Sequence, residues 1–70
     1  MQETNNGKQI ESNNLKIIKD QMECEYLLNK KYSMYSNKSN DAQIKGLCNQ
    51  ASEIHKNNFS TLKSYLDSHQ

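Results

Sequence analysis

The feature that most restricts the fold of this sequence is a long apolar stripe in its second half. Between residues 41 and 68, at the roughly 100° per residue of an α-helix, the large apolar side chains fall on one arc. That arc contains Ile44, Leu47, Cys48, Ala51, Ile54, His55, Phe59, Leu62, Tyr65 and Leu66, and the opposite arc contains Lys45, Asn49, Glu53, Lys56, Ser60, Lys63 and Asp67. A strand would need alternation at every second residue, so the pattern predicts an amphipathic helix over about 41–68.

The first half of the chain predicts a second long helix behind a polar arm. Residues 1–12 are almost all polar, with Ile10 as their one sizeable branched apolar side chain, so we expect a disordered N-terminal arm there. From residue 14 to residue 36 there is no glycine or proline, and apolar residues recur at helical spacing. These residues are Leu15, Ile17, Ile18, Met22, Cys24, Tyr26, Leu28, Tyr32 and Tyr35. The spacing predicts a helix over about 14–36.

A polar cluster at residues 36–40 separates the two predicted helices. Serine and asparagine side chains hydrogen-bond nearby backbone and favour turns, so we place a turn at 37–40. Asn40 is expected to cap the second helix by accepting a hydrogen bond from the amide of Gln43. With so short a linker, residues 13–70 are predicted to fold as an all-α antiparallel two-helix hairpin.

The apolar content is low for a chain of this length. Only 33% of the 70 residues are hydrophobic, and the mean hydropathy is −1.10. Chains this short seldom build a sufficient core without a staple, a metal or a second subunit, so we expect two hairpins to form a homodimeric four-helix bundle. The residues expected at the interface are Ile18, Met22, Leu28, Tyr32, Leu47, Ala51, Ile54 and Leu62. Leu27 and Met34 lie off the main stripe and are candidates for a partner patch.

Charge and hydropathy bear on the expected partners and location. Nine lysines against eight acids leave a net charge of +1, so we expect no nucleic-acid partner. No apolar run approaches the roughly 18 residues of a membrane span, and the first residues lack the pattern of a signal peptide, so we expect no membrane partner and a cytoplasmic or spore location. Cys24 and Cys48 should lie about 12 Å apart along the hairpin and remain thiols.

One acid and one imidazole fall inside the apolar arcs. Glu25 lies near the centre of the first arc and His55 near the centre of the second. With a turn centred near residues 38–40, residues at the same level have numbers that add up to about 78 to 80, and Glu25 and His55 satisfy this condition. The two side chains are therefore predicted to meet.

Three interpretations of this pair remain open. The two side chains can form a hydrogen-bonded pair that fixes the register of the helices, since an unpaired charge there would be costly. They can be ligands of a divalent metal ion, as inward carboxylates and histidines are in ferritin-like bundles. His55 can act as an acid and base oriented by Glu25, although the sequence offers no obvious nucleophile or oxyanion donor. We expect no enzyme activity and no required cofactor.

The stretch 17–66 resembles a known family. Glu25-Tyr26, Lys31-Tyr32, Tyr35, Ile44 to Leu47, Ala51 to His55, Leu62 and Tyr65-Leu66 are spaced as in the small coat F type of spore coat proteins, which have a ferritin-like helical bundle. This resemblance implies a structural or packaging role in sporulation. Ferritin-like di-iron sites carry an acid three residues before the histidine, and this chain has Ser52 there. The resemblance therefore does not extend to oxidoreductase chemistry.

Three functions follow as expectations. The first is a small non-enzymatic structural or interaction protein of the spore coat type. The second is a metal-binding ferritin-like module that uses Glu25 and His55. The third is a small regulatory hairpin that docks its apolar stripe on a kinase or response regulator.

Overall fold

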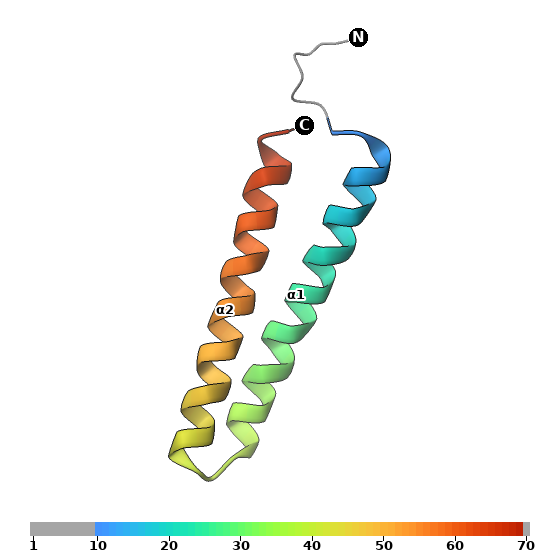
Figure 1. Cartoon of the computed structure of the whole chain (residues 1–70). Helices are drawn as coiled ribbons and strands as arrows, with labels where there is room; N and C mark the ends of the chain where they lie inside the picture. Colours follow the sequence, from blue (N-terminus) through green and yellow to red (C-terminus); the bar gives the residue numbers. More distant parts are fainter. Residues whose placement is uncertain (1–9, 70) are drawn as a thin grey trace.

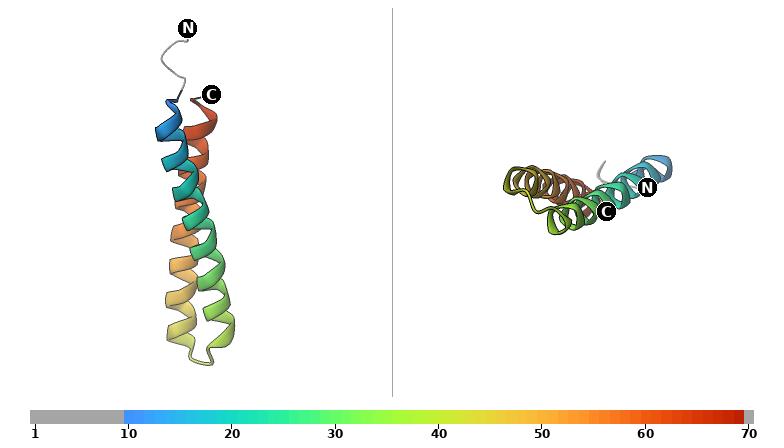
Figure 2. Two further views of the ribbon diagram at one scale, coloured as in Figure 1. Left: turned by 90° about the vertical axis from the view of Figure 1, so that its right-hand side faces the viewer. Right: turned by 90° about the horizontal axis from the view of Figure 1, so that it is seen from below.

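The computed structural model describes residues 10–69, and this part of the chain consists of two α-helices and no strand. Helix α1 spans Ser12–Lys38 and helix α2 spans Ala42–Asp67. The helices run antiparallel and side by side, so that the start of α1 and the end of α2 lie at the same end of the molecule (Figures 1 and 2). The predicted all-α hairpin is confirmed. Most of the arm predicted at 1–12 lies outside the described residues.

Both ends of α1 lie beyond the predicted limits. The helix begins at Ser12, with Glu11 as an N-cap that makes no side-chain capping bond. It continues through the polar residues Ser36 and Asn37 to Lys38, two residues further than expected. Ser36 is 5% exposed, and its backbone oxygen accepts a hydrogen bond from the Lys45 ammonium at 2.8 Å. This contact with α2 outweighs the weak helix propensity of serine and asparagine at these positions.

The turn is shorter than predicted, and its cap is a different residue. Asp41, rather than Asn40, is the N-cap of α2, and its Oδ1 accepts hydrogen bonds from the amides of Gln43 at 2.8 Å and Ile44 at 3.1 Å. The Asp41 amide in turn donates to Ser39 Oγ at 3.0 Å. The predicted cap was wrong by one residue, because α1 runs on to Lys38 and moves the turn along the chain. A carboxylate at this position also interacts favourably with the positive end of the helix.

The helices meet along a seam whose members are spaced alternately by three and four residues. This spacing is typical of coiled-coil packing, in which every seventh residue returns to the same position. We define the seam by its half-buried or buried residues, which are Leu15, Ile18, Met22, Glu25, Asn29, Tyr32 and Ser36 on α1 and Lys45, Cys48, Ser52, His55, Phe59, Leu62 and Leu66 on α2. Leu28 and Ala51, each one residue before a seam residue, are also half-buried.

The seam has two unlike halves. In the half nearer the chain ends, which we call the open half, Leu15, Ile18 and Met22 lie opposite large apolar residues of α2. In the half nearer the turn, which we call the turn half, Glu25, Asn29 and the helix end at Ser36 carry polar groups into the seam. The sequence thus supplies apolar packing to only part of the interhelical contact.

No large apolar side chain between residues 10 and 69 is fully buried. Nine of them are instead strongly exposed, with Leu47 at 65%, Ile54 at 57% and Leu27 at 56% as the most exposed. Neither α1 nor α2, within this same range, carries an apolar stretch of the kind that would cross a lipid bilayer.

Candidate functional site

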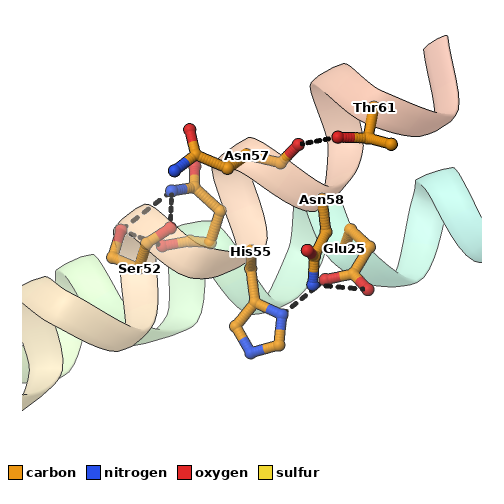
Figure 3. A network of polar contacts seen from close by, with 7 residues as sticks. Glu25, Ser52, His55, Asn57, Asn58 and Thr61 are labelled. Atoms are coloured by element: carbon orange, nitrogen blue, oxygen red, sulfur yellow. Dashed lines mark hydrogen bonds and ion pairs between the residues drawn. The ribbon is translucent and has the colours of Figure 1, made fainter. Parts of the chain in front are cut away.

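Glu25 and His55 lie opposite each other across the seam, as the residue numbering predicted. Nδ1 of His55 is hydrogen-bonded to Oε1 of Glu25. Because a carboxylate only accepts hydrogen bonds, Nδ1 carries the hydrogen and donates it. The side chains are 23% and 22% exposed, so about a fifth of each remains open to water. Figure 3 shows the His55 ring and the Asn58 amide both turned toward Glu25.

Two neighbours complete the surroundings of this pair. Nδ2 of Asn58 donates to Oε2 of Glu25 at 3.4 Å, so both carboxylate oxygens have a donor. The ring of His55 stacks on the ring of Tyr32, with centroids 5.6 Å apart and an interplanar angle of 4°. The stacking and the hydrogen bond together hold the imidazole in one orientation.

A second polar contact crosses the seam one turn nearer the hairpin turn. Nδ2 of Asn29 donates to the backbone oxygen and to Oγ of Ser52, each at 2.8 Å, and Ser52 Oγ donates to the backbone oxygen of Asn29 at 3.0 Å. These bonds join the two backbones directly. A displacement of one helix along the other by one residue would break all three.

The third contact closes the hairpin beside the turn. The ammonium of Lys45 donates to the backbone oxygen of Ser36 at 2.8 Å, and Ser36 Oγ donates to the backbone oxygen of Lys45 at 3.5 Å. Lys45 was placed on the solvent-facing arc by the sequence pattern, and this placement was wrong. Serine is small enough to let the helices approach closely, and the lysine stem then covers the gap.

The three contacts form a polar ladder, which we define as the pairs Glu25–His55, Asn29–Ser52 and Ser36–Lys45. Each rung provides hydrogen-bond partners for polar groups that lose contact with water between the helices. A polar residue at a seam position fixes register and orientation, because any other alignment leaves it unpaired. The ladder therefore specifies one alignment of α1 against α2.

Glu25 and His55 form a hydrogen-bonded pair through Nδ1 of the imidazole. The bonded oxygen and nitrogen face each other, so these two atoms do not both point at one ion. Across residues 10–69, no group of three or more His, Cys, Asp or Glu side chains is arranged to hold a metal ion. The metal and acid–base interpretations of this pair stay predictions.

The residues expected at the dimer interface separate into three groups in the single chain. Ile18, Met22, Tyr32 and Leu62 are half-buried in the seam of the hairpin itself. Leu28 and Ala51 are half-buried at its edge. Leu47 and Ile54 are exposed, as are Leu27 at 56% and Met34 at 44%, the two residues of the predicted partner patch.

Sequence reasoning missed most of the ladder. The apolar pattern at a period of 3.6 does not single out Asn29 or the pair Ser36–Lys45, because these residues are polar. The strict alternation of three and four residues from Leu15 through Glu25 and Asn29 was the signal available to find them. Cys24 is exposed and Cys48 half-buried, and both are free thiols, as expected from their offset along the hairpin.

Comparison with protein-family models, curated proteins and solved structures gives no match for this chain. The resemblance to coat F type proteins accordingly stays a prediction.

Proposed function

We propose that this protein is a non-enzymatic structural or interaction protein whose working form is a homodimeric four-helix bundle. The observation that carries the proposal is the distribution of its apolar side chains. In the part of the chain that the structure describes, none is buried, while Leu47, Ile54 and Ile44 are at least half exposed. Soluble monomers rarely leave so much of their large apolar surface uncovered, and such surface marks sites of association.

The polar ladder supports the same proposal. Because a hydrogen bond within the protein replaces one to water, each bond of the ladder contributes only about 1 kcal/mol, and the ladder does not take the place of an apolar core. The bonds do fix the register of the helices and thereby present one defined surface. A hairpin with a specified surface and a thin core is suited to serve as a building unit for assembly.

The test is whether folding and association are coupled. Far-UV circular dichroism and sedimentation velocity are recorded on the full chain over a dilution series from high to low micromolar concentration. We expect the helical signal and the dimer fraction to fall together, because a dimer that folds on association is stabilised by concentration. A fully helical monomer at low micromolar concentration would refute the proposal.

The contact between Glu25 and His55 leaves one alternative to be tested beside it. Titration of the folded chain with ferrous, manganese and zinc ions, followed by isothermal calorimetry and thermal melting, addresses the metal-binding function. Stoichiometric binding that is lost in the His55→Leu variant would favour a metal module. We expect no such binding, since no third His, Cys, Asp or Glu side chain of residues 10–69 joins the pair as a ligand.

A further inference from the structure

One long side of the hairpin carries most of the exposed apolar residues. We call it the outer face and define it by residues that each directly precede a seam residue, namely Ile17, Leu28, Tyr35, Ile44, Leu47, Ala51, Ile54 and Tyr65. In two antiparallel helices, the positions on one flank of each seam lie on the same side of the pair. The lining of a shallow groove of about 340 Å³ confirms this, since Ile17 and Tyr65 both contribute to it.

The outer face is most apolar where the seam is most polar, and it is most polar where the seam is apolar. In the turn half, where the seam carries the polar ladder, the outer face presents Leu28, Tyr35, Ile44, Leu47, Ala51 and Ile54. In the open half, where the seam is apolar, the corresponding outer positions include Asn14, Gln21, Asn58 and Thr61, with Ile17 and Tyr65 as the large apolar members. The turn half therefore directs its apolar side chains out of the hairpin.

The exposed area on this face approaches what a stable dimer needs. Six of the nine strongly exposed apolar residues belong to it, with fractional exposures from 43% for Tyr35 to 65% for Leu47. Half of a large apolar side chain is about 100 Å², so the six expose roughly 600 Å² together, against about 800 Å² per partner in a standard interface. Flanking half-buried residues such as Leu28 and Ala51 lie at the same surface and extend it.

Building on the proposed self-association, we infer that two copies pair through their outer faces about a two-fold axis parallel to the helices, with both turns at the same end. This arrangement places the apolar turn half of each copy on the same half of the other. A fully overlapping pair with turns at opposite ends would place Leu47 and Tyr35 at the level of Gln21 and Thr61 in the open half. An offset pair that overlaps only the turn halves would leave Ile17 and Tyr65 uncovered.

The charge on this side of α1 fits the same arrangement. Lys31 directly precedes the seam residue Tyr32 and lies on the outer side of the turn half. With turns together, α1 of one copy packs beside α2 of the other, and the residue of α2 at the level of Lys31 is Gln50, which is exposed and uncharged. Lys31 therefore has no charged residue of α2 at its level and lies apart from Lys31 of the other copy.

Cross-linking tests the orientation. Single cysteines are introduced at the turn by Asn40→Cys and at the open end by Asn14→Cys, in a background of Cys24→Ser and Cys48→Ala. A bis-maleimide reagent much shorter than the roughly 40 Å length of the helices is applied to each variant and to a mixture in which one variant carries a mass tag. We expect turn-to-turn and open-to-open products and no turn-to-open product.

The possible outcomes separate the orientation from the self-association on which it rests. A turn-to-open product would overturn the orientation and leave the proposed dimer standing. A chain that sediments as a dimer but gives neither a turn-to-turn nor an open-to-open product would have the same meaning. A chain that sediments as a monomer overturns both the orientation and the proposed function.

A matched pair of leucine variants tests the face itself. Leu47 and Leu27 are similarly exposed, at 65% and 56%, but only Leu47 belongs to the outer face. We expect Leu47→Glu to raise the dimer dissociation constant at least tenfold and Leu27→Glu to leave it within about twofold. Equal effects of the two substitutions, or a larger effect of Leu27→Glu, would overturn the assignment of this face.

Discussion

The pair Glu25–His55 predicts a strong energetic coupling that a double-mutant cycle can measure. In His55→Leu, Oε1 of Glu25 loses its donor while the side chain stays nearly four-fifths buried, and Oε2 keeps only the 3.4 Å contact with Asn58. An unsatisfied buried acceptor costs about 1 to 3 kcal/mol, and the water that reaches the exposed fifth of the carboxylate favours the lower part of that range. We expect His55→Leu to lower the free energy of unfolding by about 1 to 2 kcal/mol.

Changing both partners removes the penalty. In Glu25→Leu with His55→Leu, no polar group is left unpaired, and two leucines occupy seam positions that coiled coils favour. We expect the double variant to be as stable as the parent chain or more stable. The stability change caused by Glu25→Leu should therefore differ by at least about 1 kcal/mol between the parent chain and the His55→Leu background.

The assay is urea unfolding followed by far-UV circular dichroism, with all variants at one protein concentration, because dimer stability depends on concentration. The control is the same cycle on Lys16 and Asp20, whose side chains are 74% and 65% exposed and 3.0 Å apart. That cycle should give a coupling of no more than about 0.5 kcal/mol. If Glu25→Leu changes stability equally in both backgrounds, the two side chains do not interact and the reasoning is refuted.

Two further variants test local features of the hairpin by the same unfolding assay. Asp41→Ala removes a cap that accepts hydrogen bonds from two amides, and it should lower the free energy of unfolding by about 1 kcal/mol. Asn40→Ala should change the free energy of unfolding by no more than about 0.3 kcal/mol. A larger loss for Asn40→Ala than for Asp41→Ala would favour the cap predicted from sequence. Gly46→Ala places a Cβ that meets nothing within 4 Å on an exposed helical position, and should stabilise the chain by about 0.5 to 1 kcal/mol. A loss of stability there would mean that another surface packs against Gly46.

The apolar stripe of α2 does not by itself locate the seam. The stripe of α2 is centred between the seam and the outer face, because Ile44, Leu47 and Ile54 contribute strongly to it while lying outside the contact with α1. The direction of the apolar stripe identifies the side of a helix that is apolar. It does not distinguish the apolar residues that contact the other helix of the same chain from those that remain exposed.

The contact between Glu25 and His55 was predictable for a different reason. The position of the turn sets the level at which residues of the two helices meet, so an error of one or two residues in the turn shifts the match only slightly. The identity of the cap was more sensitive. Choosing between Asn40 and Asp41 required knowing that α1 continues to Lys38, and that continuation depends on the contact between Ser36 and Lys45.

The sequence by itself determined that this chain is two amphipathic helices joined by a short polar turn, because helical periodicity and turn chemistry are local properties. It also determined that the apolar surface is too sparse to fill a core. Only the tertiary structure decided which side of each helix faces the other, because that choice depends on Asn29, Ser52 and Lys45 finding partners across the seam. Polar groups between helices are satisfied only in one alignment, and that alignment turns the apolar residues of the turn half outward.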